Sequence, residues 1–322
     1  MKHQKLFLEI ANDLKKVEKE LDKFLKVSDP VLSQTCVYLL QAGGKRMRPG
    51  FTLLSGKFFQ YKFEKLLPVA MAIELIHMAT LVHDDVVDAS LTRRGRPTLA
   101  ASWGNTVSIA TGDYLFAKAL ELIVKIDDPK VSRILADVSI EMCQGEIQQI
   151  KCSYDINQSP KEYYYRIRRK TALLLGLSCK LGAIMSNADS RQVWLMSTYG
   201  HCLGIAFQIV DDILDITANP KVLGKPVGGD IRQGIITLPM IYALQDTQSS
   251  ERLKTLLSKR VKSEEETQEA VELIKESGGI EKSREVVTLY IEKAIRHLYE
   301  LPDIGSRGAL IELAEFVGER GY

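Results

Sequence analysis

The sequence predicts an all-α fold, and three observations carry that prediction. Apolar residues recur at steps of three and four along nearly the whole chain of 322 residues, which is the period of an amphipathic helix. Strands of alternating polarity joined by hairpin turns are not apparent in the sequence, and neither is a β-α-β rhythm. Breaks rich in glycine and proline are few, so we expect long helices between them.

The helices are expected in the following order. The first is an amphipathic N-terminal helix, whose apolar face consists of Leu6, Ile10, Leu14, Val17, Leu21 and Leu25. The segments with helical periodicity or strong helix formers are 31–42, 50–60, 66–83, 106–125, 130–150, 161–186, 190–217, 236–246, 264–277 and 280–299. The last third, about residues 245–322, is rich in charge and has no evident chemistry, so we interpret it as helical scaffold.

Three breaks separate these helices. Gly43-Gly44 ends one helix and Pro49-Gly50 opens the next, in the positions that these residues prefer at helix ends. Gly95 to Pro97 forms the second break. The longest irregular stretch is expected from Ala218 to Gly234, where glycine and proline are concentrated.

The stretch from Ala218 to Gly234 also contains two cations, Lys225 and Arg232. It directly follows a cluster of aspartates. We therefore interpret it as a lid over an anionic substrate, with a plain surface connection as the alternative.

Composition limits the class of protein. The chain is 45% hydrophobic and 26% charged, as is ordinary for a soluble globular protein with an ample core. A net charge of +2 gives no electrostatic footprint for nucleic acid. The five cysteines form no C-x-x-C pair, which favours buried thiols in a reducing compartment. No run approaches the roughly 18 apolar residues of a membrane span, and residues 1–26 lack a signal-peptide core, so we expect a cytoplasmic protein.

Two aspartate clusters with the same spacing, D-D-x-x-D, carry the clearest chemical signal. They are Asp84-Asp85-Val86-Val87-Asp88 and Asp211-Asp212-Ile213-Leu214-Asp215. On a helix the first and last aspartates of each cluster share a face. Both clusters emerge from apolar segments, where an unpaired charge is costly, so we predict that they bind a hard cation such as Mg²⁺ together with substrate phosphates. Solvated helix ends are the alternative.

The two clusters also bear on domain organisation. Length alone would allow two domains. However, two facing clusters would hold one diphosphate through bridging metals only if they converge. We therefore expect a single domain over residues 1–322.

Basic and polar side chains accompany the clusters. The segment GGKRMRP at 43–49 places three cations and two glycines at a helix junction, where backbone amides and side chains can meet an anion. The pair Arg93-Arg94 follows the first cluster within a turn or two. The remaining candidates are His77, Lys170, Thr171 and Gln208. The plain alternatives are a core residue for His77, a solvated side chain for Lys170 and a packed one for Thr171, whereas Gln208 lies three residues before Asp211 on the same helical face.

These motifs together resemble those of the trans-isoprenyl diphosphate synthases. The matching elements are GGKRMRP at 43–49, HDDVVD at 83–88, RRGRPT at 93–98, KTA at 170–172, FQIVDDILD at 207–215 and GKPVGGD at 224–230. The resemblance runs over essentially the whole chain. It implies an isoprenoid synthase-type helical bundle around a central active-site cavity, and Mg²⁺-dependent prenyl transfer.

The resemblance implies a role for each matching residue. The diphosphate of isopentenyl diphosphate is expected to bind Gly44, Lys45, Arg48, His77 and Arg94. The allylic diphosphate is expected to bind Arg93, Lys170, Thr171, Gln208 and Lys225. Metal ligands are expected to be Asp84, Asp88, Asp211 and Asp215, and catalytic residues Asp84, Asp85, Asp88, Asp211, Asp212 and Lys170. Many family members have a lysine where this chain has Ile235, which leaves Lys225 or Arg232 as the cation of the lid.

A closer similarity is to the larger, catalytic component of two-component hexaprenyl and heptaprenyl diphosphate synthases. It rests on the segments ELIHMATLVHDDVVD, GEIQQIK, RRKTALL and GKPVGGD. It implies a heptaprenyl product for a quinone side chain, made from isopentenyl diphosphate and an allylic primer such as farnesyl diphosphate, with a hexaprenyl or other medium or long chain as the alternative. It also implies a smaller, different subunit as partner, with a homodimer as the alternative.

Two other classes of protein fit these motifs less well. A class I terpene cyclase shares the helical fold and one Asp-rich motif, but its second metal motif mixes Asn or Asp, Ser or Thr, and Glu. Such a cyclase also has no use for GGKRMRP. A non-catalytic subunit of a prenyl synthase would have lost aspartates or arginines that this chain keeps.

Overall fold

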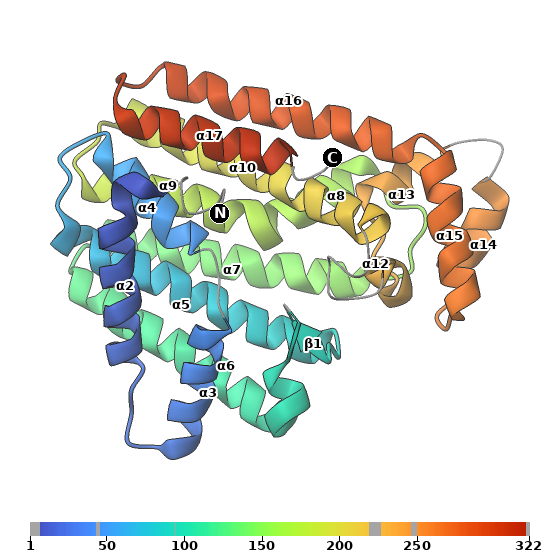
Figure 1. The fold of residues 1–322 in the computed structure, drawn as a ribbon, viewed down its shortest axis with the longest axis horizontal. Coiled ribbons are helices and arrows are strands. Elements are labelled where there is room, and N and C mark those ends of the chain that lie inside the picture. Colours follow the sequence, from blue (N-terminus) through green and yellow to red (C-terminus); the bar gives the residue numbers. More distant parts are fainter. Residues whose placement is uncertain (1–6, 43–45, 94, 219–226, 246–249, 320–322) are drawn as a thin grey trace. The chain divides into compact units, whose positions relative to one another are not determined.

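The computed structural model describes residues 7–42, 46–93, 95–218, 227–245 and 250–319, and most of this part of the chain is helical (Figure 1). This confirms the all-α class. The elements through the second aspartate cluster are η1 (Leu8–Ile10), α2 (Ala11–Phe24), α3 (Pro30–Gln41), α4 (Met47–Lys57), α5 (Phe63–Val87), β1 (Thr92–Arg93), β2 (Arg96–Pro97), α6 (Leu99–Ile126), α7 (Pro129–Lys151), α8 (Pro160–Ile167), η2 (Arg168–Ala172), α9 (Leu173–Met185) and α10 (Ser190–Thr217). The later elements are α12 (Gly229–Gln233), α13 (Leu238–Ala243), α14 (Ser250–Ser258), α15 (Glu264–Glu276), α16 (Gly279–Tyr299) and α17 (Gly305–Glu319).

A short hairpin between α5 and α6 departs from the expected all-helical pattern. β1 pairs antiparallel with β2, with Thr92 opposite Pro97 and Arg93 opposite Arg96. Gly95, at the turn, has a φ of 74°, a left-handed conformation that glycine adopts without steric cost. The expectation of no hairpin is wrong here, because strands of two residues are too short for an alternation of polarity to reveal them.

The expected lid segment lies partly outside the described residues. Its last part forms the short helix α12, so the expectation of an irregular chain is wrong for Gly229–Gln233. Gly228 and Gly234 flank this helix with φ values of 77° and 71°. Because glycine tolerates this left-handed conformation, a single helical turn can begin and end within a segment rich in glycine.

The chain forms two compact units, each assembled from segments that are far apart in the sequence. Unit 1 comprises Met1–Ala136, Leu174–Gly200 and Leu298–Glu312, and unit 2 comprises Asp137–Leu173, His201–His297 and Leu313–Tyr322. The first aspartate cluster belongs to unit 1 and the second belongs to unit 2. A single domain over residues 1–322 stays a prediction.

Side-chain hydrogen bonds join the distant segments of unit 1. The hydroxyl of Ser306 donates to the Glu9 carboxylate over 2.7 Å, although these residues are 297 positions apart. The hydroxyl of Tyr199 is buried and donates to the Leu310 carbonyl over 2.8 Å. The segment Leu298–Glu312 is therefore an integral part of unit 1.

Helix α5 is packed against α6, α4 and α2 within unit 1. Its middle part is apolar on nearly every side, and residues such as Val69, Ala72 and Ile73 are fully buried. A helix that is apolar all round is stable in water only when neighbouring helices enclose it. Burying a side chain such as Ile73 stabilises the fold by about 1.5–3 kcal/mol. This packing holds the C-terminal end of α5, where the first aspartate cluster lies.

Two helices, α5 and α10, are long and apolar enough to cross a membrane by length and composition alone. In the structure, 67% of the apolar window of α5 and 61% of that of α10 are buried. The core helices of soluble proteins pass the same test, so this finding is weak evidence for a membrane span.

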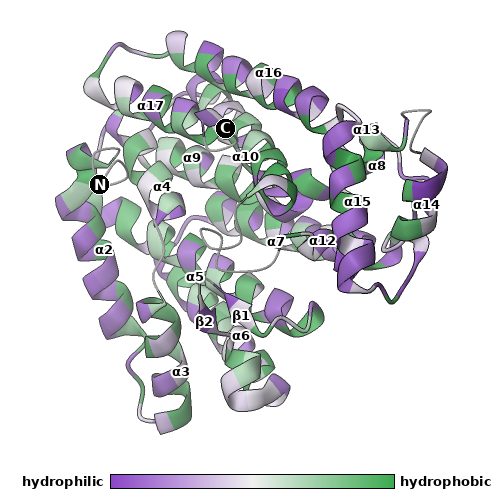
Figure 2. Ribbon diagram, turned by 45° about the vertical axis from the view of Figure 1, so that its right-hand side comes forward, coloured by the Kyte–Doolittle hydropathy of each residue, from purple (hydrophilic) through white to green (hydrophobic). Residues whose placement is uncertain are grey.

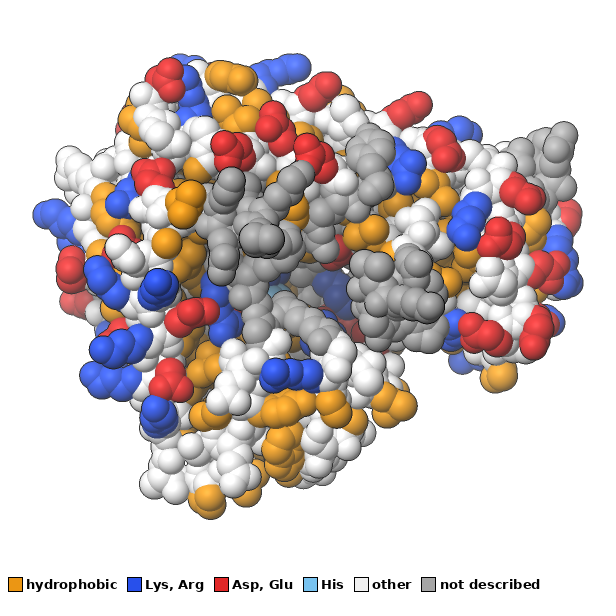
Figure 3. Space-filling view, viewed as in Figure 1, with side chains coloured by type: hydrophobic (Ala, Val, Ile, Leu, Met, Phe, Trp, Pro, Cys, Tyr) orange, Lys and Arg blue, Asp and Glu red, His pale blue; other side chains and the backbone are white. Residues whose placement is uncertain are grey.

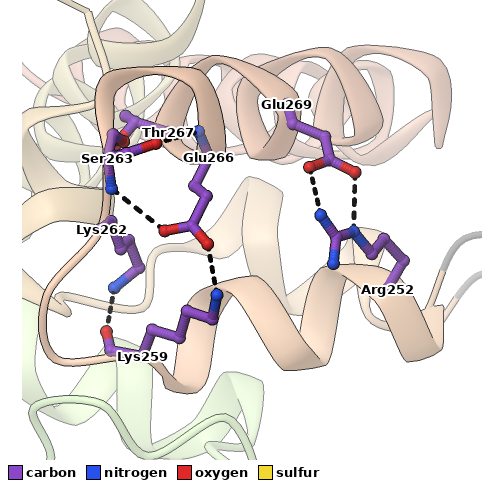
Figure 4. A network of polar contacts seen from close by, with 7 residues as sticks. All are labelled: Arg252, Lys259, Lys262, Ser263, Glu266, Thr267 and Glu269. Atoms are coloured by element: carbon purple, nitrogen blue, oxygen red, sulfur yellow. Dashed lines mark hydrogen bonds and ion pairs between the residues drawn. The ribbon is translucent and has the colours of Figure 1, made fainter.

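Polar contacts fix α15 against α14 in unit 2 (Figure 4). Ser263 and Glu266 form a capping box at the start of α15, and Glu266 also pairs with Lys259. The Arg252 guanidinium forms a two-pronged ion pair with Glu269, with N–O distances of 2.7 and 2.5 Å. The hydrophilic character of α15 is clear in Figure 2, and acidic and basic side chains are mixed on the face drawn in Figure 3.

Candidate active site

The first aspartate cluster lies at the C-terminal end of α5. The N–H of Asp88 donates to the carbonyl of Asp84 over 2.8 Å, so these two residues lie one helical turn apart, and both are half-buried. Asp85 is buried and pairs with Arg93 of the hairpin: its Oδ1 lies 2.8 Å from Nε and 2.7 Å from Nη2. Asp84 and Asp88 thus have the spacing expected of a shared face, whereas Asp85 is paired with the Arg93 guanidinium.

The pairing of Arg93 with Asp85 refines the roles that the sequence suggests. Arg93 is expected at the allylic diphosphate and Asp85 in catalysis. In the structure the guanidinium neutralises the buried carboxylate, and removing either partner would leave the other charge poorly compensated. The Arg93 side chain is still 38% exposed, and a guanidinium has five N–H donors, so Arg93 can also meet an anion.

The expected site for isopentenyl diphosphate is described only in part. Gly44, Lys45 and Arg94 lie outside the described residues, and so does Lys225 of the lid. Arg48 lies in the first turn of α4 and His77 lies on α5, and both side chains are half-buried. Both belong to unit 1.

Arg46 connects the start of α4 to α5. Its backbone is left-handed, with φ 45° and ψ 40°, a conformation that strains a residue with a Cβ. The guanidinium donates to Glu74 Oε1 over 2.9 Å and to the Leu40 carbonyl over 3.1 Å. The Arg46 and Glu74 side chains are only 10% and 5% exposed. This buried ion pair therefore fixes the junction that carries Arg48 to the part of α5 that carries His77.

We expect Glu74→Gln to destabilise the protein strongly, because it leaves the buried Arg46 charge with only the more exposed Glu18 carboxylate, 3.3 Å from its Nε. Breaking a buried pair in this way costs about 3–5 kcal/mol. Urea unfolding followed by circular dichroism measures the loss. Arg252→Met is the matched control, since it removes one partner of an exposed ion pair and should change the unfolding free energy far less. Equal losses for the two variants would contradict the structural role of the Arg46–Glu74 pair.

The second aspartate cluster lies at the C-terminal end of α10, in unit 2. Asp211 is half-buried, whereas Asp212 and Asp215 are buried. The N–H of Asp230 donates to Asp215 Oδ2 over 3.0 Å, and the N–H of Gly228 donates to the Asp215 carbonyl over 2.7 Å. Asp215 therefore connects α10 to the first turn of α12, the helical part of the expected lid.

Asp212 lies at the centre of a buried hydrogen-bond chain. The Tyr163 hydroxyl donates to Asp212 Oδ2 over 2.6 Å, and the Gln208 amide donates to Oδ1 over 2.9 Å. Burial raises the pKa of Asp212 to about 7, while these two hydrogen bonds and the nearby Arg166 act in the opposite direction. Both carboxylate oxygens of Asp212 therefore accept a hydrogen bond from a neighbouring side chain.

The segment with Lys170 and Thr171 differs from the single helix expected over 161–186. A π-helical turn, η2, interrupts it at Arg168–Ala172. Such turns are rare and occur often at functional sites. Here the turn carries both candidate residues: Lys170 Nζ pairs with Glu146 of α7 at 3.0 Å, and the Thr171 hydroxyl donates to Gln208 Oε1 over 2.6 Å.

Two glycines permit this close packing around η2. A Cβ on Gly204 of α10 would lie 2.5 Å from the Cα of Ala172. A Cβ on Gly145 of α7 would lie 2.6 Å from the Cβ of Arg169. Both distances are below any normal contact, so only glycine lets α7 and α10 approach η2 this closely.

Sequence reasoning did not assign individual roles to Arg46, Glu74, Glu146 or Tyr163. Arg46 and Glu146 do lie in the motifs GGKRMRP and GEIQQIK, so the motifs gave a signal for them. Glu74 could have been found as a lone acidic residue in the apolar segment of α5, which needs a buried partner. Nothing in the local sequence distinguishes Tyr163 from Tyr164 and Tyr165 beside it.

The donor set of the two clusters fits Mg²⁺. Each cluster offers two carboxylates one helical turn apart, Asp84 with Asp88 and Asp211 with Asp215. Within the described ranges, no three His, Cys, Asp or Glu side chains form a ready-made metal cage. Mg²⁺ usually takes one or two carboxylates from the protein and completes its shell with water and substrate phosphates.

Long helices that end in paired aspartates, beside basic side chains, define an enzyme that handles diphosphates within an all-α fold. The family model for polyprenyl synthetases matches residues 29–274, and the chain belongs to this family. It is therefore a prenyltransferase of the trans-polyprenyl diphosphate synthase type.

Individual relatives match this chain in sequence and structure over nearly its full length. The heptaprenyl diphosphate synthase component 2 of Bacillus subtilis is 43% identical over 322 residues, which are 100% of this chain and 92% of that protein. The crystal structure of heptaprenyl diphosphate synthase from Staphylococcus aureus has a TM-score of 0.93 and 38% identity, covering 97% of this chain and 99% of that one. A polyprenyl synthase from Caulobacter crescentus, complexed with calcium and isoprenyl diphosphate, has a TM-score of 0.95 and 33% identity, with 99% and 98% coverage.

Proposed function

We propose that this chain is a Mg²⁺-dependent synthase that condenses isopentenyl diphosphate units with an allylic diphosphate to a long-chain all-trans product. The observation that carries the proposal is the matched construction of the ends of α5 and α10. Each has an outer pair of aspartates one turn apart and a buried middle aspartate with its own partners, Arg93 for Asp85 and Tyr163 with Gln208 for Asp212. In the second cluster the outer Asp215 is buried as well. The proposal requires that both clusters act on one substrate, within a single domain over residues 1–322.

The outer aspartates would hold Mg²⁺, which when bound supplies Lewis acidity toward the diphosphate leaving group. Side chains of the protein would bind and orient the two substrates. Arg48 and His77, with Gly44, Lys45 and Arg94, would bind isopentenyl diphosphate and orient its double bond toward the allylic carbon. Arg93, Lys170 and Lys225 would hold the allylic diphosphate.

In the reaction the allylic carbon–oxygen bond breaks and the double bond of isopentenyl diphosphate forms the new carbon–carbon bond. The oxygen dipoles of Thr171 and Gln208 would stabilise the allylic cation between these events. A proton then leaves the adjacent carbon, and the departing diphosphate accepts it. The product is again allylic, so the cycle repeats.

We assign a heptaprenyl product, farnesyl diphosphate as primer, a quinone side chain such as that of menaquinone as destination, and a cytoplasmic location. The support for chain length is the name of the Bacillus relative and the sequence phrases shared with that subgroup. A hexaprenyl or other medium to long product is the alternative. The calcium and isoprenyl diphosphate of the Caulobacter relative support a divalent metal for this site.

The test is incubation with labelled isopentenyl diphosphate and farnesyl diphosphate, with Mg²⁺ or with EDTA, followed by mass analysis of the products. We expect labelled long-chain diphosphates only with Mg²⁺. A cyclised hydrocarbon made from the allylic substrate alone would indicate a terpene cyclase. Absence of product both alone and with candidate partners would indicate a non-catalytic subunit.

We expect the purified chain to be weakly active alone and to gain at least tenfold in long-chain synthesis with a smaller, different subunit. This expectation rests on the name of the Bacillus subtilis relative, which describes that protein as component 2 of its synthase. Size-exclusion chromatography with light scattering, run beside the product assay, measures both association and activity. Full long-chain synthesis by a homodimer of this chain would contradict the partner while leaving the enzyme class intact.

A further inference from the structure

We propose that Glu146 competes with the allylic diphosphate for the ammonium group of Lys170, and that this competition favours the release of inorganic diphosphate after each condensation. The inference rests on the proposed function, because it takes Lys170 as a ligand of the allylic diphosphate. It concerns one compact unit alone, since Glu146 on α7 and Lys170 on η2 both belong to unit 2.

Close backbone packing at Gly145 builds the contact between α7 and η2. A Cβ on this glycine would lie 2.6 Å from the Cβ of Arg169 and 3.4 Å from the backbone nitrogen of Lys170. The next residue of α7 is Glu146, whose Oε2 lies 3.0 Å from Lys170 Nζ. The Glu146 and Lys170 side chains are 21% and 26% exposed. The pair is therefore held between two packed elements, unlike an ion pair between long side chains in open solvent.

The Glu146 carboxylate is partly withdrawn from water, and Lys170 compensates its charge. Its other oxygen, Oε1, is buried and has no hydrogen-bond partner among the residues that the structure describes. A carboxylate in such a place has lost part of its hydration, which the ion pair with Lys170 replaces. If another anion draws Nζ away, the carboxylate loses this compensation, and the cost lowers the net affinity for that anion.

A diphosphate bound at Lys170 must share the ammonium group with Glu146. The two anions also repel each other, because they carry charge of the same sign. The competition acts on the allylic substrate and on inorganic diphosphate alike, since both present a diphosphate group to Lys170. An enzyme that adds several units releases inorganic diphosphate in every cycle, so weaker binding of this product favours the start of the next cycle.

A second ion pair between α7 and η2 offers an internal comparison. Glu141 Oε2 lies 3.4 Å from Arg169 Nη2, and the Glu141 side chain is 35% exposed. Arg169 has no expected role at a substrate. Neutralising Glu141 therefore removes the same charge from the same helix and leaves the pair of Glu146 with Lys170 in place.

The test is the Kd of inorganic diphosphate for Glu146→Gln, measured by isothermal titration calorimetry with Mg²⁺ present. Glutamine keeps an oxygen that can accept from Lys170, so the ammonium group stays in place while the competing charge is lost. We expect the Kd to fall about fivefold, the upper end of the range for exposed ion pairs, because this pair is largely buried. The Ki of inorganic diphosphate as an inhibitor of prenyl transfer should fall by the same factor. Glu141→Gln is the matched control and should change the Kd by less than about twofold.

A double-mutant cycle shows whether the effect passes through Lys170. Lys170→Met should raise the Kd about tenfold or more, because it removes a charged donor. In that background Glu146→Gln should tighten binding by less than about twofold. Circular dichroism checks that each variant is folded.

The sign of the change in Kd is decisive, because a purely structural role for the ion pair predicts unchanged or weaker binding. An unchanged or higher Kd for Glu146→Gln would overturn the competition, and so would an equal gain in the Lys170→Met background. An unchanged Kd for Lys170→Met would overturn it as well. These outcomes apply to a wild-type enzyme that makes labelled prenyl diphosphates, whereas a wild-type chain that is inactive both alone and with a partner would overturn the proposed function itself.

Discussion

Replacing Asp84 or Asp211 by Asn should nearly abolish turnover while the fold stays intact. Each variant removes one carboxylate from an outer pair, Asp84 with Asp88 or Asp211 with Asp215, and those pairs are the donor set that we assign to Mg²⁺. Loss of a group that stabilises developing charge lowers kcat by about 10²–10³, and loss of a metal ligand should cost at least that much. Steady-state assays over a range of Mg²⁺ concentrations measure the effect.

The same variants should keep or raise the melting temperature measured without metal. Neighbouring carboxylates repel each other, so removing one charge lowers the electrostatic repulsion within the cluster of the metal-free protein. Asp22→Asn on α2 is the matched control: it removes one partner of the exposed Lys26–Asp22 ion pair and should keep wild-type turnover. Near wild-type rates for Asp84→Asn at saturating Mg²⁺ would show that the metal is held elsewhere.

Ala79→Phe should shorten the product to about the geranylgeranyl class. Ala79 is fully buried on α5 and lies five positions before Asp84, roughly 7.5 Å along the helix from the first cluster. We expect the growing tail to run along this helix, past Ala79 and Thr80 and on toward Ile76 and Ile73. A phenyl ring at position 79 should block that passage, because a packed interior cannot absorb the added volume. Ile76→Ala should allow the same product or a longer one.

Mass analysis of the products decides this prediction, with Ala70→Phe as the control. Ala70 is also fully buried on α5, but nine positions before Ala79, about 180° around the helix. Overpacking at either position should cost about 1–3 kcal/mol of stability. A shortened product from Ala79→Phe alone supports the passage. An unchanged long product at good activity would mean that the tail runs elsewhere.

Helical periodicity made most of the fold predictable, because long apolar faces such as that of α5 leave a clear signal. The hairpin at Thr92–Pro97 was not predictable, since its strands are too short to show any period. The π-turn at Arg168–Ala172 was missed for a related reason. It arises from packing against Gly145 and Gly204, which lie far away in the sequence, rather than from the residues of the turn.

The candidate site was also predictable from the sequence only in part. Spacing alone predicted that the outer aspartates of each cluster share a face, because the helical period fixes it. The distinct position of the middle aspartates was not predictable. Asp85 turns to Arg93 and Asp212 turns to Tyr163, and each partner lies in another element whose position depends on tertiary packing.

The bond between Ser306 and Glu9 has a consequence for biosynthesis. A ribosome adds roughly 5–20 residues per second, so Glu9 emerges roughly 15–60 s before its partner 297 positions later. Throughout that interval unit 1 lacks Leu298–Glu312, and apolar surface that this segment covers stays open to aggregation or to a chaperone. Folding that must wait for such distant contacts is slow, so the yield of native enzyme should depend on chaperone supply and on the temperature of expression.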